Sequence, residues 1–199
     1  MELPLRCRCG KVRGQVDLDR AWARVTCCCM DCQSFARFLG TPGILDEAGG
    51  TDIVPMAPDA LRFTAGFEQV ACMTLGPKGL LRWYAACCRT PLANLPRDPK
   101  MFYCGLIVAC LEDVPAGTLE ARFGPRGAAV VQTGSALAPV RSSRWRVFRS
   151  VLGIAPGVIG AWLRRRRVGA PFLDGAGRPI REPETITREQ RQALQLPPT

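Results

Sequence analysis

Apolar and polar residues alternate with a period of two through much of the chain as far as Leu111, and this alternation predicts β-strands with one buried face. The clearest case is "KVRGQVDL" at 11–18, where Val12 and Val16 fall on the same face. Glycine and proline together number 37, which favours short strands and many turns over long helices. We therefore expect short half-buried strands in this part of the chain.

A hairpin is predicted between the runs at 69–75 and 80–88, because "GPKG" between them is a strong turn signal. The second run places Leu81 and Trp83 on one face. The continuous apolar run "GLIVACL" at 105–111 is typical of a buried strand. The predicted fold class is mainly β, built from antiparallel sheets.

The pattern changes near residue 140, where helical segments are predicted. "SSRWRVFRSVLG" predicts a short helix that ends at Gly153, and Pro156 suits the first turn of a second helix, "PGVIGAWLRRRR". The apolar stretch 151–163 contains a proline, and we expect it to be too short to span a bilayer. Thr187 and Gln190 have the capping-box spacing of a last short helix.

One face of the second predicted helix is apolar, and we expect it to pack on the β-rich part while "RRRR" at 164–167 stays exposed. The alternative is that this helix contacts a membrane or a partner. The face consists of Val158, Ile159, Trp162 and Leu163.

Charge divides the chain into two parts. Residues 1–125 hold 14 Lys or Arg against 13 Asp or Glu, whereas residues 126–199 hold 13 against 4. We therefore predict a β-domain at 1–125 and a basic, partly helical C-terminal extension at 126–199. The chain contains no histidine, which removes the usual general base at neutral pH.

All eleven cysteines lie in the first part. The N-terminus lacks the apolar core and cleavage site of a secretory signal, so a cytoplasmic location is expected. Disulfides rarely persist in that reducing compartment, and adjacent cysteines make poor disulfide partners for each other. The cysteines are therefore better explained as metal ligands or nucleophiles.

The cysteines fall into short-spaced groups, and thiolates one or two residues apart can converge on one ion where the backbone turns. "CRCG" holds Cys7 and Cys9, and "ACCRTPLAN" holds two more. Tetrahedral zinc takes four thiolates in a structural site, or three protein ligands and an open position in a reactive one. The second group contains C-x-C-x-x-C, namely Cys27, Cys29 and Cys32, with Cys28 inside it.

The order of these motifs resembles the glutathione-dependent formaldehyde-activating enzymes, a superfamily that also contains centromere protein V. The resemblance covers about residues 5–112 and rests on C-x-C-G, C-x-C-x-x-C and a cysteine before "TPL" after an aromatic strand. The string "GPKGLLRWYAACCRTPLAN" is most similar to an uncharacterised bacterial branch. The resemblance implies a zinc-stapled β-tent fold.

The resemblance also implies two zinc ions with different roles. A structural zinc would be held by Cys7, Cys9 and Cys88. A second zinc, on Cys27, Cys29 and Cys32, would hold a thiol substrate such as glutathione for addition to formaldehyde. The implied activity is that of a carbon–sulfur lyase, with these three cysteines at the catalytic site.

This sequence departs from the family pattern at three positions. Cys28 stands where the family has histidine, Ala85 where it has the first cysteine of C-x-x-C, and Arg89 where glycine usually follows. Cys87 could supply the fourth structural ligand. Neighbours on a strand point to opposite faces, so Cys87 and Cys88 reach one ion only if the chain turns there.

Other interpretations of the residues remain open. Cys27, Cys28, Cys29 and Cys32 could all bind one closed structural ion. Water or Asp31 could carry protons. Four arginines could hold the carboxylates of glutathione, namely Arg24, Arg37, Arg82 and Arg89. The rival function is a non-enzymatic zinc module whose basic tail docks on nucleic acid, a membrane or an acidic partner. Nucleic acid is the least favoured of the three, because the tail has few aromatic residues for base stacking.

Overall fold

The computed structural model describes residues 1–98, 100–111, 114–164 and 171–195, and within these residues the fold is mainly β. The strands are β1 Glu2–Arg6, β2 Arg13–Asp17, β3 Val25–Cys27, β4 Thr51–Met56, β5 Leu61–Ala65, β6 Val70–Thr74, β7 Leu81–Ala85, β8 Thr90–Leu95, β9 Cys104–Ile107, β10 Val130–Val131 and β11 Glu184–Thr185. The α-helices are α1 Met30–Leu39, α2 Thr118–Phe123, α3 Arg144–Leu163 and α4 Arg188–Gln195.

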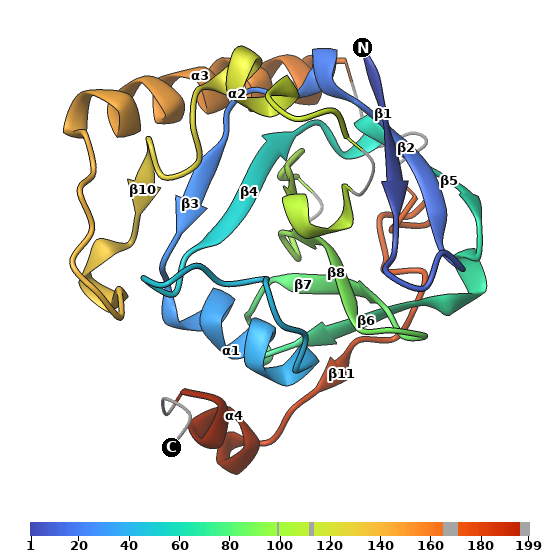
Figure 1. The fold of residues 1–199 in the computed structure, drawn as a ribbon. Helices are drawn as coiled ribbons and strands as arrows, with labels where there is room; N and C mark the ends of the chain where they lie inside the picture. Colours follow the sequence, from blue (N-terminus) through green and yellow to red (C-terminus); the bar gives the residue numbers. More distant parts are fainter. Residues whose placement is uncertain (99, 112–113, 165–170, 196–199) are drawn as a thin grey trace.

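The strands form a small sheet and a large one (Figure 1). The small sheet has the order β1-β2-β5, and the large sheet has the order β10-β3-β4-β9-β8-β7-β6-β11. The main apolar core includes Leu5 and Val16 from the small sheet and Trp83 and Leu92 from the large one. The core therefore lies between the two sheets.

The hairpin predicted at 69–88 is confirmed, because β6 pairs antiparallel with β7 and Val70 lies opposite Ala85. The predicted face of the 11–18 segment is also confirmed, since Val12 and Val16 are fully buried. Alternation along the chain was sufficient here, because each of these segments buries the predicted face in one core.

The segment 105–111 is only partly a strand, which corrects the sequence prediction. β9 ends at Ile107 and a 3₁₀ turn follows at Val108–Cys110. The Cys110 thiol lies 3.0 Å from the Ile107 carbonyl oxygen, and Cys110 is fully buried. The apolar run continues past the strand because the turn also points into the core.

The large sheet is mixed rather than purely antiparallel, and its two parallel strands come from the segment after residue 125. β10 pairs parallel with β3 at one edge, and β11 pairs parallel with β6 at the other (Figure 1). Phe172 from the same segment is fully buried against Trp83, with 4.8 Å between ring centroids. The described part of 126–199 thus closes both edges of the sheet and contributes to the core.

α3 is one helix of 20 residues, whereas the sequence pattern predicted two short helices broken after Gly153. Pro156 lies inside it. A proline in a helix removes one hydrogen bond and crowds the carbonyl four residues earlier, here that of Leu152. Both Leu152 and Pro156 are exposed, so water can solvate that carbonyl and the helix continues.

The helix packs through a face opposite to the predicted one. Ile159, Trp162 and Leu163 are exposed, and Val158 is half-buried. The contact is made instead by small residues, because a Cβ at Gly157 would lie 2.4 Å from the ring of Trp22. Of the predicted exposed "RRRR", Arg164 is exposed, and 165–167 lie outside the described residues.

The length of α3 also overturns the expectation that this segment is too short to cross a bilayer. Among the described helices, Trp145–Leu163 is long and apolar enough to do so by length and composition. The prediction counted only the apolar stretch 151–163, whereas the helix begins at Arg144 and continues through Pro156.

The last helix begins with the predicted capping box. The Thr187 N–H donates to Gln190 Oε1 at 2.8 Å, and the Gln190 N–H donates to Thr187 Oγ1 at 3.2 Å. α4 packs on α1, where Arg37 donates to the Leu194 carbonyl at 2.7 Å. Figure 1 shows α1 and α4 at one end of the molecule and α3 at the other.

Candidate metal centres

Four cysteines from two distant loops meet at the edge of the molecule near the small sheet. Cys7 and Cys9 lie in the turn between β1 and β2, and Cys87 and Cys88 lie in the turn between β7 and β8. All four Sγ atoms are within 4.8 Å of one another. We call this set the four-cysteine group.

The sulfur separations in this group fit a tetrahedral ion. Cys7 Sγ lies 3.5 Å from Cys9 Sγ and 3.8 Å from Cys87 Sγ, and the last two atoms are 3.3 Å apart. Four thiolates at about 2.3 Å from one zinc would be about 3.8 Å from each other. The measured distances between these sulfur atoms are therefore close to those that a tetrahedral metal site requires.

The chain turns between β7 and β8 as two adjacent ligands require. Residues 86–89 form a turn, and Arg89 has φ of 55°, a left-handed conformation that glycine adopts most easily. The resemblance described above leads to an expectation of glycine at this position. The sulfurs of Cys87 and Cys88 consequently both lie close to those of Cys7 and Cys9, while Ala85 remains in the strand and is buried.

Hydrogen bonds prepare part of the four-cysteine group for deprotonation. Burial raises the pKa of Cys88, but donors at the Thr90 hydroxyl and the Cys9 backbone N–H lower it to about 6. Burial raises the pKa of Cys7, partly offset by the Val12 N–H, which donates to its sulfur at 3.3 Å. Without an ion the group thus combines a thiolate at neutral pH with a protonated partner.

The second set consists of Cys27, Cys29 and Cys32, whose sulfurs also lie within 4.8 Å of one another. We call it the three-cysteine group. Cys27 ends β3, Cys29 is the N-cap of α1, and Cys32 lies in the first turn of that helix. A strand end and a helix start therefore supply all three ligands.

α1 was not predicted from the sequence, although its signal was present. Cys32, Phe35, Ala36 and Leu39 are all buried and have helical spacing. The helix ends at Gly40, which has φ of 61°. This periodicity covers only a short segment, which also begins with the cysteine spacing of a metal site.

Cys29, the N-cap of α1, has the lowest pKa in the three-cysteine group. Hydrogen bonds from Cys27 and Cys32 lower the pKa of Cys29 to about 2, aided by the Cys32 backbone N–H at 3.3 Å. The hydrogen bond with Cys29 raises the pKa of Cys27. Contact with Cys27 lowers the pKa of Cys32, but Cys29 and burial outweigh this and raise it to about 11. A thiolate at the Cys29 position also suits the positive end of a helix dipole.

A buried arginine lies beside the three-cysteine group. Arg82 is 1% exposed, and its Nη1 lies 4.0 Å from Cys32 Sγ and 3.3 Å from the side-chain oxygen of Asn94. Its Nη2 is 3.9 Å from Asp31, and its Nε has no hydrogen-bond partner among the described residues. The positive charge lowers the pKa of Cys29 and Cys32.

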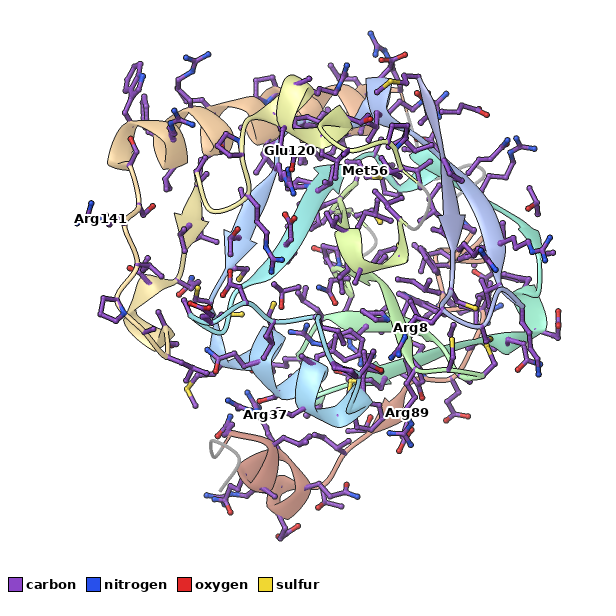
Figure 2. The ribbon with its side chains drawn as sticks, viewed as in Figure 1. Arg8, Arg37, Met56, Arg89, Glu120 and Arg141 are labelled. Carbon is purple, nitrogen blue, oxygen red and sulfur yellow. The ribbon has the colours of Figure 1, made fainter. Side chains whose placement is uncertain are left out.

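The other three candidate arginines are held elsewhere. Arg24 forms an ion pair with Asp52 at 2.7 Å and another with Glu120. Arg37 donates to a backbone carbonyl of α4, and Arg89 donates to one at Phe38. In Figure 2, Arg37 and Arg89 lie beside α1, whereas Glu120 lies at the opposite end of the molecule beside α2.

Cys28 is fully buried and does not belong to the three-cysteine group, which corrects the alternative of four ligands on one ion. The three cysteines outside the candidate metal groups, apart from Cys28, belong to the main apolar core. Cys72, Cys104 and Cys110 are all buried.

Tyr103 was missed by sequence reasoning. Burial and then the neighbouring Cys104, Cys27 and Cys32 raise its pKa, so the phenol keeps its proton at neutral pH. It follows Phe102 before β9, and no motif marks it. Only the pairing of β9 with β4 brings it near the three-cysteine group.

Both groups could hold a metal ion, and their chemistry restricts which kind. Thiolate sulfur suits zinc, copper(I) and iron–sulfur clusters and does not suit magnesium or calcium. The close sulfurs of the four-cysteine group and the cation beside the three-cysteine group fit such an ion.

The chain is similar to a Rhodobacter sphaeroides protein whose crystal structure was solved in a structural genomics project. The two are 23% identical, the match covers 60% of this chain and 94% of that one, and the TM-score is 0.40. No curated protein matches the chain. Residues 1–152 match the family model DUF6151, described as a family of unknown function, and the chain belongs to that family.

Proposed function

We propose that this protein is a zinc enzyme that makes or breaks a carbon–sulfur bond on a small thiol adduct, with S-(hydroxymethyl)glutathione as the model substrate. The observation that carries the proposal is the contrast between the two groups. Among the residues that the structure describes, four cysteines would supply a complete ligand set at one group, whereas three cysteines with a buried arginine beside them would leave the set at the other group incomplete. A complete thiolate set is typical of structural zinc, and three ligands are typical of reactive zinc.

Cys7, Cys9, Cys87 and Cys88 would hold the structural ion. They join the turn after β1 to the turn after β7, and so tie the small sheet to the large one. The β-tent arrangement implied by the resemblance would be stapled at this point. We place the protein in the cytoplasm, where these thiols and glutathione stay reduced.

Cys27, Cys29 and Cys32 would hold the second ion. Zinc there would favour the thiolate form of a bound thiol, which is the nucleophilic form. In the forward reaction the substrate sulfur forms a bond to the carbon of formaldehyde, the carbonyl π-bond breaks, and a proton is added to the oxygen. The reaction involves no oxidation or reduction.

Arg82 would offset the negative charge of the group. Three thiolates around a divalent ion leave a net charge of −1, and a substrate thiolate adds another. A buried guanidinium 4.0 Å from Cys32 stabilises this charge more than an exposed one could. Its position also keeps Asp31 nearby at 3.9 Å.

Two groups could move the proton in the absence of histidine. Asp31 is a carboxylate at the rim, held 3.1 Å from Arg191 of α4. The Tyr103 phenol is protonated at neutral pH and can donate to the developing oxygen. The sequence suggested only the first, and the fold adds the second.

The proposal is tested by metal content and by exchange kinetics. Protein purified without chelator should contain two zinc ions per chain by elemental analysis. The protein should also accelerate the reversible formation of S-(hydroxymethyl)glutathione from glutathione and formaldehyde. Magnetisation-exchange NMR measures this rate.

Cys29→Ser should abolish the acceleration and leave one zinc per chain. Cys72→Ser is a matched control, because Cys72 is a buried cysteine outside both groups. Two zinc ions without any acceleration for glutathione would disprove the substrate assignment, and fewer than one zinc ion would disprove the whole proposal.

The second candidate function is a zinc module that docks on an acidic surface. One observation favours it: α3 is rich in exposed apolar residues and lies within the basic part of the sequence. The two functions are compatible, because α3 and the three-cysteine group use different residues.

A further inference from the structure

The two sides of α3 differ in the size of their side chains. Gly153, Gly157 and Ala161 are spaced four residues apart and therefore form one line along the helix. Gly153 and Gly157 approach Trp22, and Ala161 is buried in a small apolar cluster. This line of small residues attaches the helix to the domain.

Large apolar side chains occupy the other side of the helix. At 100° per residue they lie within an arc of about 120°, centred opposite the line of small residues. Each is at least half exposed, up to 67% at Leu163. This exposed apolar face consists of Trp145, Phe148, Val151, Leu152, Ile159, Trp162 and Leu163.

A groove extends the exposed apolar face toward the sheet. It has a volume of about 900 Å³ and lies between α3 and β10. Val130, Val131 and Val140 line it together with Trp145 and Phe148. The apolar surface is therefore wider than the helix alone.

Positive charge surrounds this face at both ends. Residues 121–173 contain ten arginines and no aspartate or glutamate. Arg141 precedes the helix and Arg146 and Arg149 lie in its first two turns, and all three are exposed. Arg164, also exposed, follows the last residue of the helix. Figure 2 shows Arg141 at the outer edge of the molecule, ahead of α3.

We propose that α3 is an in-plane membrane anchor, which inserts its exposed apolar face into the surface of an anionic bilayer. Helices that lie in the bilayer interface combine an apolar face with arginine or lysine and with tryptophan. Trp145 and Trp162 lie near the two ends of the helix, and tryptophan prefers the level of the lipid headgroups. The anchor specifies the docking surface of the second candidate function and does not depend on the zinc chemistry.

Charge selects the membrane over a second copy of the chain. If two α3 helices packed face to face in either direction, arginines would meet arginines at both ends. Anionic lipids instead attract each arginine close to the surface. The attachment through Gly153 and Gly157 selects an in-plane helix over a spanning one, because crossing the bilayer would pull the helix away from Trp22.

The experiment is sedimentation of the full-length protein with vesicles. The protein should bind vesicles made from a two-to-one mixture of phosphatidylcholine and phosphatidylglycerol at least tenfold more tightly than vesicles of phosphatidylcholine alone. Binding should fall as salt is raised, and alkaline carbonate should release the protein.

Two pairs of variants separate the apolar and the charged contributions. Phe148→Ser with Leu152→Ser should weaken binding at least tenfold, whereas Leu80→Ser, also exposed but far from α3 in the sequence, should not. Arg141→Gln with Arg149→Gln should weaken binding more than Arg178→Gln with Arg188→Gln, which removes the same charge elsewhere. Circular dichroism checks that each variant is folded.

Several outcomes would overturn the proposal. One is equal binding to neutral and anionic vesicles, or none to either. Another is a dimer in analytical ultracentrifugation that the serine variants dissociate, which would assign the face to a second copy. Resistance to carbonate would show that the helix spans the bilayer instead.

Discussion

The guanidinium of Arg82 lies 4.0 Å from the sulfur of Cys32, and both side chains are buried. Burial of an arginine is costly unless its charge is compensated. Asp31, at 3.9 Å, is partly exposed and also pairs with Arg191. The negative charge of the three-cysteine group, which lies on Cys29, therefore compensates part of the charge of Arg82, and Arg82 in turn lowers the pKa of Cys29 and Cys32.

Replacement of Arg82 should weaken metal binding at the three-cysteine group alone. For Arg82→Met we expect the zinc affinity of that group to fall by about ten- to a hundredfold, as for other residues that support metal ligands. Competition with a chromogenic chelator measures this change. Arg62→Met on the exposed side of β5 is the control and should leave both ions in place. Loss of both ions together would contradict the assignment.

Serine replacements should separate the roles of the two groups. Cys7→Ser should lower the melting temperature strongly, because zinc binding at a structural site contributes directly to folding free energy. Cys29→Ser should remain folded and lose one zinc ion. Calorimetry and elemental analysis on the same samples test both statements. Equal destabilisation by the two variants would mean that both groups are structural.

The contact between Gly157 and Trp22 should be sensitive to a single methyl group. A Cβ at Gly157 would lie 2.4 Å from the indole ring, so Gly157→Ala should destabilise the protein by about 1–3 kcal/mol or release α3. Urea denaturation measures the first effect and proteolysis of α3 the second.

Gly160→Ala provides the matched control on the same helix. Apart from its own stretch of helix, a Cβ at Gly160 would meet no atom of the described residues within 4 Å, and alanine is the better helix former by about 1 kcal/mol. This variant should be neutral or slightly stabilising. Identical behaviour of the two variants would show that α3 does not pack on Trp22 in solution.

Phe172 should behave as a core residue although it lies in the C-terminal extension. Its ring is fully buried against Trp83, so Phe172→Ala should reduce the free energy of unfolding by about 3–5 kcal/mol. Phe148→Ala, on the exposed side of α3, should change it by less than about 0.5 kcal/mol. Urea titration of both variants decides between a core role and a separable tail.

Features that depend on residues close together in the chain could be predicted from the sequence. The hairpin at 69–88, the buried face of β2 and the capping box at Thr187 each depend on residues close together in the chain. The C-x-C and C-x-x-C spacings indicated ligand groups for the same reason, because a short backbone segment limits how far apart its thiols can lie.

Only the tertiary structure decided which distant groups meet. Cys9 and Cys87 are 78 positions apart, and their sulfurs come within 3.3 Å only because β1 and β7 lie on facing sheets. Alternation placed Arg82 on the polar face of β7, opposite Leu81 and Trp83. That face is nevertheless buried, because α1 covers it and the ring of Phe35 lies 5.4 Å from the guanidinium.

The orientation of α3 is the clearest feature that the hydrophobic pattern of the sequence did not predict. Hydrophobicity predicted that the large apolar residues face the domain, as they do in most helices of soluble proteins. The structure packs the glycines inward instead, because the indole of Trp22 leaves no room for a side chain at Gly157. Sequence determined that α3 has an apolar face, and the shape of the surface beneath it decided that this face points outward.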